Sequence, residues 1–339
     1  MRKGIFILIS VFLFSCSSEV EKLDYELIFG NKTQEFIFSK SEDFIIKGNQ
    51  GTLIMIPKKM IEQEFGDFDS ISFKLREYYT KSDFIKAGLS TTSNGKLLES
   101  KGMIFLQVFL NKEEIELKNI PIHVIFKEFN FEDNYQIFYG NETNESINWN
   151  LDTITPNYHI FYNYVLYGKE SDYLDQTFNN IIIDSILWTN SYTQIDTIGT
   201  FEESNDTLYS FNPDYYGMDQ MAVLKKNKFF RVLPFNWANL DIFLKLENLT
   251  TVEITSNKIN DPHYFCVFQK YNSIIPNYQN TFNGVPVGEI VSIIGVDFVD
   301  NKIYFDIQKQ VEIKNDMTVK LKLKETEKTE IDSILKELD

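Results

Sequence analysis

Short runs of alternating apolar and polar residues recur along most of the chain. Ile71–Arg76 shows the pattern clearly, because its isoleucine, phenylalanine and leucine fall on one face of an extended strand. Gly288–Val299 and Lys302–Ile313 predict longer strands, and Asp300–Asn301 between them suits a two-residue hairpin turn. The pattern therefore predicts an all-β protein. The other predicted strands are Leu23–Phe29, Glu35–Phe38, Phe44–Lys47, Thr52–Ile56, Met103–Leu110, Ile122–Phe126, Ile242–Leu246, Val252–Thr255, Tyr264–Phe268 and Met317–Leu323.

Helical spacing is confined to short segments. Apolar residues recur every three or four positions within 325–339, which predicts a C-terminal amphipathic helix. Ser82–Asp83 can cap a single helical turn that runs through Gly88. For residues 169–190 the pattern leaves helix and strand open, since a short apolar run such as Ile181–Trp188 fits both.

The length of 339 residues and the changes in composition along the chain predict two or three tandem β-sandwich-like domains. Residues 23–129 contain the first set of alternating strands and form the first sandwich. Polar residues dominate 130–157, which we interpret as a linker. A middle β region rich in aromatic residues follows over 158–241. The order of strands in 242–324 resembles a small immunoglobulin-like or transthyretin-like sandwich.

The chain begins with a basic segment and an apolar run, Ile5–Phe14, that ends in Ser15–Cys16. This arrangement is typical of a bacterial lipoprotein signal, so residues 1–15 are predicted to be a signal peptide. Cys16 would then carry the lipid, including palmitate, and residues 16–22 would form a polar tether. The apolar run is too short for a transmembrane helix, which needs about 20 residues. We expect an outer-membrane protein that faces the periplasm or the cell surface.

The chain is acidic, with a formal net charge of -16. This charge disfavours nucleic acid and anionic lipid as partners, because both bind basic surfaces. The general explanation of this charge is that it keeps the protein soluble at a crowded surface. With Cys16 lipidated, Cys266 is left alone, so no intrachain disulfide is expected. Its apolar neighbours predict a buried thiol rather than a nucleophile.

Four segments resemble a family of uncharacterised Bacteroidetes envelope lipoproteins. They are Gly51–Pro57, Ile71–Glu77, Ala87–Glu99 and Gly102–Ile104. The first domain, residues 23–129, is also weakly similar to the β-sandwich called ZU5. The resemblance implies an exported, all-β protein. It assigns no activity, and therefore no catalytic residue is carried over.

A further part of the resemblance lies near Trp237. Relatives carry the stretch Gly-Trp-Ile-Asn-Cys-Asp, of which Trp237, Asn239 and Asp241 are present here. Ala238 and Leu240 replace the isoleucine and the cysteine. In such lipoproteins, acidic residues just after the lipidated cysteine accompany surface display, and this chain has two glutamates within six residues of Cys16.

Aromatic and polar clusters suggest ligand contacts but also have structural explanations. Tyr162, Tyr164 and Trp237 are candidate ligand-facing aromatics for a sugar, and the same side chains suit a core and its rim. Residues 90–95 can form a polar ligand loop, or only a turn at Asn94–Gly95, where both residues tolerate positive φ.

Motifs for catalysis are sparse. His123, His159 and His263 lie in separate contexts and lack the spacing of zinc ligands. No Gly-x-Ser-x-Gly motif occurs. Carboxylate pairs of the glycosidase kind cannot be selected from 49 acidic residues. We therefore expect no enzymatic activity and no cofactor.

One tripeptide, aspartate followed by a hydroxyl residue and an aliphatic residue, recurs more often than composition predicts. It resembles the O-glycosylation acceptor of exported Bacteroidetes proteins, and it equally suits the start of a β-strand. The candidate acceptors are Ser70, Thr153, Ser185, Thr197, Thr207 and Ser333.

These observations favour a non-enzymatic, lipid-anchored envelope protein that acts as a binding or accessory scaffold subunit. Its expected partners are the membrane, through the N-terminal lipid, and an envelope protein or a glycan. The alternatives are a glycan-binding surface module and a hydrolase that uses carboxylate catalysis.

Overall fold

The computed structural model describes most of the chain from residue 23 onward. For residues 59, 123, 158–166, 196–200, 207–210 and 222–232 it describes the backbone alone. The described residues are 23–30, 32–40, 44–56, 58–117, 120, 122–127, 134–142, 146–153, 158–166, 196–200, 207–210, 222–232, 236–257, 260–277 and 279–339.

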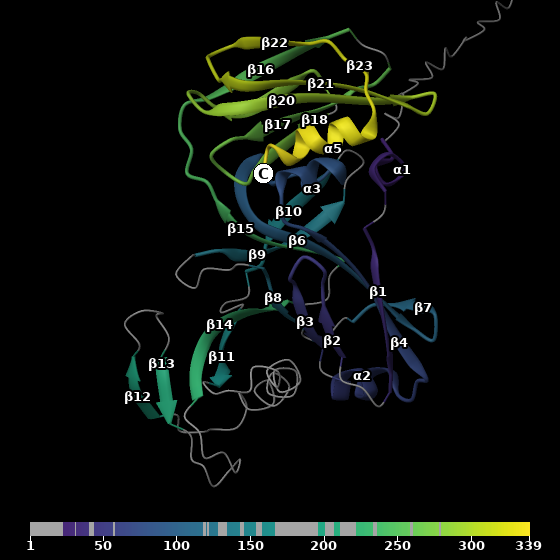
Figure 1. Ribbon diagram of the computed structural model, residues 1–339, viewed down its shortest axis with the longest axis vertical. Coiled ribbons are helices and arrows are strands. Elements are labelled where there is room, and N and C mark those ends of the chain that lie inside the picture. The colour runs from purple at the N-terminus through teal and green to yellow at the C-terminus, as the bar shows by residue number, and fades with distance from the viewer. Residues whose placement is uncertain are drawn as a thin grey trace, which may run out of the picture.

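The protein is all-β, with sandwich-like units and a short C-terminal helix, as the sequence predicts (Figure 1). Sheet 1 has eight strands in the order β1-β4-β6-β15-β9-β10, with β5 and β7 also paired to β6. Its strands are β1 (Gln34–Ser39), β4 (Ser70–Tyr78), β5 (Thr92–Ser93), β6 (Lys96–Leu110), β7 (Glu113–Ile115), β9 (Gln136–Glu142), β10 (Ile147–Leu151) and β15 (Trp237–Phe243).

Sheet 2 has seven strands in the order β12-β13-β14-β8-β3-β2, and β11 pairs with β14. All of its pairs are antiparallel. Its strands are β2 (Phe44–Lys47), β3 (Leu53–Ile56), β8 (Ile122–Ile125), β11 (Tyr158–Leu166), β12 (Asp196–Thr200), β13 (Thr207–Ser210) and β14 (Ala222–Val232).

The C-terminal part forms a second sandwich from two smaller sheets. Sheet 3 has the order β19-β16-β22, in which β16 and β22 pair in parallel, and sheet 4 has the order β18-β17-β20-β21-β23. Their strands are β16 (Leu249–Ser256), β17 (His263–Phe268), β18 (Ile274–Asn277), β19 (Thr281–Pro286), β20 (Ile290–Val299), β21 (Lys302–Glu312), β22 (Met317–Leu321) and β23 (Lys324–Glu325).

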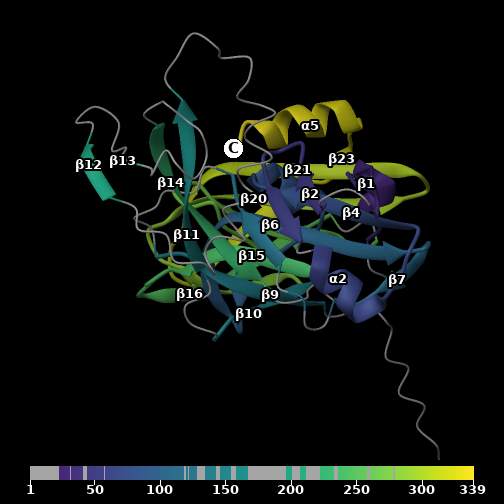
Figure 2. The same ribbon diagram turned by 90° about the horizontal axis from the view of Figure 1, so that it is seen from below.

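In the described part of the chain, four short helices accompany the sheets. They are α1 (Tyr25–Phe29), α2 (Lys58–Phe65), α3 (Lys81–Lys86) and α5 (Lys328–Lys336). α5 lies beside α3 (Figure 1) and against the C-terminal sandwich (Figure 2). Its buried Ile331 and Leu335 confirm the predicted amphipathic helix. α3 begins slightly earlier than predicted, because Thr80 and Asp83 form a capping box.

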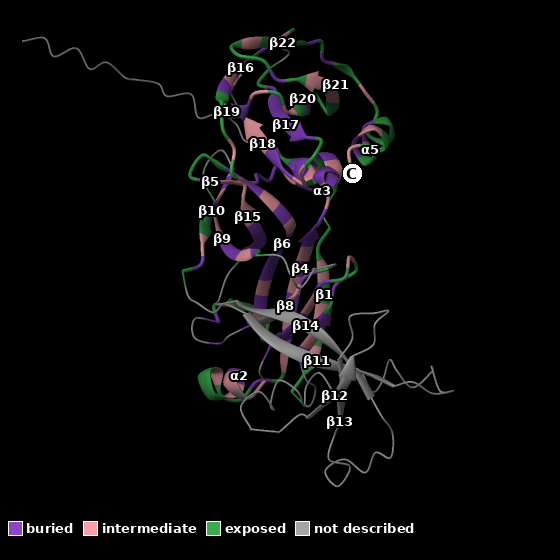
Figure 3. Ribbon diagram, turned by 90° about the vertical axis from the view of Figure 1, so that its left-hand side faces the viewer, coloured by how far each residue is buried: buried purple, intermediate pink, exposed green. Residues whose placement is uncertain are grey.

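Three hydrophobic cores join the sheets into one body. The first core lies between sheets 1 and 2, and the third lies within the C-terminal sandwich. The second core joins the opposite face of sheet 1 to the helices and to sheet 4. Strand β4 shows why this is possible: Phe73 and Leu75 enter the first core, whereas Tyr78 enters the second. Buried residues accordingly run along β6 and through α3 (Figure 3).

Two sequence expectations about organisation are corrected by this arrangement. The range expected to be a linker, 130–157, contains β9 and β10, whose alternating residues were obscured by polar neighbours. The middle region, 158–241, does not form a unit of its own, because β14 pairs with β8 and β15 pairs with β6 and β9. The segment 169–190 lies outside the described residues.

One predicted strand is a helix, and two predicted turns are confirmed. Residues 23–29 alternate in hydrophobicity, yet they form α1 because the Asp24 carboxylate caps it by accepting from the Leu27 N–H at 2.9 Å. Asn94–Gly95 joins β5 to β6, with positive φ at both residues. Asp300–Asn301 does the same for β20 and β21.

Candidate functional site

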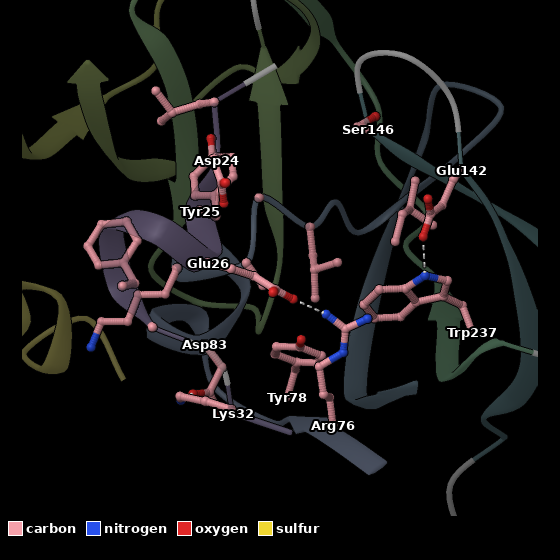
Figure 4. Close-up of a pocket in the computed structure, with 18 residues that line it drawn as sticks. Asp24, Tyr25, Glu26, Lys32, Arg76, Tyr78, Asp83, Glu142, Ser146 and Trp237 are labelled. Atoms are coloured by element: carbon pink, nitrogen blue, oxygen red, sulfur yellow. Dashed lines mark hydrogen bonds and ion pairs between the residues drawn. The ribbon is translucent and has the colours of Figure 1, made fainter. Parts of the chain in front are cut away.

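A cavity of about 390 Å³ opens where α1 meets sheet 1 (Figure 4). Its volume lies within the range of small-ligand sites, about 300–1,000 Å³. α1 forms one wall, and Glu142, Ser146 and Ile147 at the ends of β9 and β10 form the other, while β4 and β15 supply the floor. The lining residues are Leu23, Asp24, Tyr25, Glu26, Phe29, Gly30, Lys32, Arg76, Tyr78, Asp83, Lys86, Ala87, Gly88, Leu89, Glu142, Ser146, Ile147 and Trp237.

The α1 wall is fixed by Tyr25, which packs between the two sandwiches. Its ring fills the space beside Gly88, where an added Cβ would lie 2.4 Å from Tyr25 Cε2. Its hydroxyl is 2.8 Å from Nδ1 of the buried His263, and its ring meets Phe265 edge to face. Gly88 also has a φ of +62°, a conformation that favours glycine. One aromatic residue therefore connects α1 to both halves of the protein.

The floor consists of aromatic rings that carry an arginine. The Arg76 guanidinium carbon lies 4.0 Å from the ring centre of Phe105 and 5.5 Å from that of Trp237. Tyr78 stacks on Trp237 with 5.7 Å between ring centres. Burial raises the pKa of Tyr78 to about 12, so its hydroxyl remains protonated. The floor is thus an aromatic surface that carries the positive charge of Arg76.

Carboxylates surround this charge. Glu26 Oε1 accepts a hydrogen bond from Arg76 Nη1 at 2.5 Å, and Glu142 Oε1 accepts one from Trp237 Nε1 at 2.7 Å (Figure 4). Lys32 pairs with Asp83 at the base of α3. The cavity can therefore bind a ligand through a cation on its floor and anions on its rim, with apolar walls between them.

A second polar cluster lies farther along β15, the strand that carries Trp237. Asn239 Nδ2 donates to Asp241 Oδ2 at 2.5 Å, and Ser100 Oγ donates to Asn239 Oδ1 at 2.8 Å. Both Asn239 and Asp241 are fully buried. Burial raises the pKa of Asp241 well above its usual value, against the hydrogen bonds from Ser100 and Asn239, and nearby Glu99 raises it further. The raised pKa favours the protonated form of Asp241, whose Oδ1 is buried without a hydrogen-bond partner.

The candidate aromatics have different outcomes. Trp237 lines the cavity, but only 6% of its surface is exposed, so it cannot act as a flat sugar platform. Tyr162 and Tyr164 lie on β11, where only the backbone is described. Cys16 lies outside the described residues. Cys266 is fully buried, as predicted, and burial raises the pKa of its thiol.

The candidate O-glycosylation residues are scattered over the fold. Thr153 is exposed, as is Ser333 on α5, whereas Ser70 is half-buried at the start of β4. Thr197 and Thr207 lie on β12 and β13, for which the backbone alone is described. Ser185 lies outside the described residues. Their modification stays a prediction.

Sequence reasoning missed the charged residues of the cavity. Arg76 was expected only as a polar position of a strand, and Glu142 lay in the expected linker. Arg76 contacts Glu26, 50 residues away, and Glu142 contacts Trp237, 95 residues away. No local spacing reveals such pairs. The one available signal was Trp237 itself.

Among the described residues, no three or more histidine, cysteine, aspartate or glutamate side chains are grouped so that they could hold a metal ion. No helix in the described part of the chain is long and apolar enough to cross a membrane. The chain matches no protein-family model, no curated protein and no solved structure.

Proposed function

We propose that this protein is a non-enzymatic, lipid-anchored protein of the bacterial outer membrane that binds a ligand or partner as an accessory subunit. The cavity beside α1 is the observation that carries this proposal. It combines a concave shape, an aromatic floor and charges of both signs, which is a composition suited to recognition. Membership of the envelope lipoprotein family described above remains part of the proposal.

The position of the cavity supports an anchored role. Leu23 and Asp24, the first described residues, line its wall. The seven residues 16–22 span at most about 25 Å when fully extended, so a lipid on Cys16 would hold the cavity close to the membrane surface. Tethering at this distance raises the local concentration of any partner in the same membrane.

The proposal is tested by fractionation and crosslinking in the cells that produce the protein. Wild type should sediment with the outer membrane, and Cys16→Ala should release the protein into the soluble fraction. Chemical crosslinking of intact cells should give the same adduct repeatedly with wild type, and less of it with Cys16→Ala. If the variant still sediments, the anchor is wrong, and if no adduct recurs, the binding role is wrong.

A further inference from the structure

Arg76 is arranged as a binding site for an anion. Its guanidinium rests on the Phe105 ring and near the Trp237 ring, and 19% of its side chain is exposed, on the cavity side. A guanidinium has five N–H donors in a planar fork and can bind a carboxylate through two of them. The aromatic floor holds this fork in one orientation, which lowers the entropy lost when an anion binds.

A carboxylate of the chain itself already occupies one position on this fork. Glu26 contacts Arg76 Nη1 from the five-residue helix α1, and 52% of the Glu26 side chain is exposed. An ion pair with one partner so exposed contributes little to stability. Another carboxylate can therefore displace Glu26 without unfolding α1. The helix stays in place because the Tyr25 ring packs on Gly88 and the Tyr25 hydroxyl contacts His263.

The rest of the cavity extends the ligand chemistry. The half-buried Leu23 and Phe29 supply apolar surface beside the Arg76 fork. Glu142 is exposed on the opposite wall, where it suits an ammonium group or another hydrogen-bond donor. The ligand that fits is a zwitterion: it has a carboxylate, an apolar body and a positive charge at the far end.

We propose that the cavity binds the C-terminal end of a short peptide, whose carboxylate replaces that of Glu26 on the Arg76 guanidinium. The last side chain of the peptide packs on the apolar wall. A basic or amino group toward its N-terminus faces Glu142. This assignment rests on the binding function proposed above and names its ligand class.

The direct test is isothermal titration calorimetry of the full mature chain with defined tripeptides. The probes are Lys-Ala-Leu as the free acid, the same peptide as the C-terminal amide, and Glu-Ala-Leu as the free acid. Loss of a charge-assisted hydrogen-bonded pair should weaken binding of the amide by about tenfold or more. Glu-Ala-Leu should bind more weakly than Lys-Ala-Leu, because its glutamate faces the acidic rim.

Two variants separate recognition from structural support. Arg76→Gln should abolish the difference between acid and amide, whereas Glu26→Gln should strengthen binding of the acid by about two- to fivefold, because the internal competitor is removed. Matched controls change the same charges outside the cavity. Lys74→Gln removes a cation from β4, the strand of Arg76, where Lys74 lies over the Phe109 ring. Glu35→Gln removes an exposed carboxylate of β1.

Thermal unfolding of each variant checks that it is folded. If Arg76→Gln does not fold, Arg76→Lys takes its place. Arg76→Lys should bind the acid more weakly, because lysine lacks the fork. Absence of saturable heat with wild type up to about 10 mM peptide overturns the proposal. Equal binding of acid and amide, or weaker binding by Glu26→Gln, overturns it too. A recurrent crosslinked adduct in cells would then still support the broader binding role through another surface.

Discussion

Asp241→Asn should gain stability relative to wild type as the pH rises. The Asp241 side chain is fully buried on β15, where its Oδ2 accepts from Asn239 Nδ2 at 2.5 Å. An asparagine keeps this acceptor and the shape of the side chain, and it never ionises. The substitution removes the energetic penalty of a buried acid that tends to lose its proton as the pH rises. It also places a buried amide NH2 where Asp241 Oδ1 has no hydrogen-bond partner, and this fixed cost does not change with pH.

The size of the effect follows from proton linkage. Because burial raises the folded-state pKa of Asp241 well above 3.8, the unfolded chain loses this proton first. The wild-type stability that comes from this group is complete below the unfolded pKa and is lost as the pH rises through the folded pKa. Between the two pKa values it falls by about 1.4 kcal/mol per pH unit. The stability advantage of Asp241→Asn should grow at the same rate.

Urea unfolding of wild type and Asp241→Asn at a series of pH values measures this advantage. Asp297→Asn is the matched control, because the Asp297 carboxylate accepts from the N–H groups of Asn260 and Phe298 at 2.8 Å each. Loss of one acceptor should destabilise that variant by about 1–3 kcal/mol. An advantage of Asp241→Asn that stays constant from about pH 5 to about pH 8 would refute the reasoning.

Three further substitutions or treatments test the packing. Gly88→Ala should displace Tyr25 and lower the free energy of unfolding in urea by about 2–4 kcal/mol. Gly95→Ala is the control: this glycine also has a positive φ but open space around it, so the loss should be only about 1 kcal/mol. Equal losses would contradict the close packing of Tyr25 on Gly88. Glu77→Gln should lower the free energy of unfolding by about 2–3 kcal/mol, because the buried carboxylate accepts hydrogen bonds from two backbone N–H groups. An unchanged unfolding midpoint would argue against that role. Cys266 should react with Ellman's reagent only after unfolding, and rapid reaction of the native protein would show that it is not buried.

Alternation of residues revealed most strands, because each strand of a sandwich shows its pattern locally. The same signal misled at residues 23–29, where the N-cap at Asp24 and the contacts of Tyr25 favour a helix. It also missed α2. Local patterns carry no information on which sheet a strand joins, so the shared core and the role of β15 could not be predicted.

The cavity was less predictable than the fold. Trp237 was selected as a candidate, but the other lining residues come from α1, β4 and the ends of β9 and β10, which are distant in sequence. Trp237, Asn239 and Asp241, the three positions matched by the family resemblance, have neighbouring positions on one face of β15. That face points into the junction between the two sandwiches, where it carries both the cavity floor and the buried acid.

The central claim, that a partner occupies the cavity beside α1, is tested most directly by site-specific crosslinking in intact cells. A photo-reactive amino acid would be introduced in place of Ser146 on the cavity wall, and separately in place of Glu253, which is exposed on β16. The account predicts a recurrent adduct from position 146 alone, which disappears in Arg76→Gln and in the presence of excess Lys-Ala-Leu acid. An adduct equally strong from both positions, or none from position 146, would contradict it.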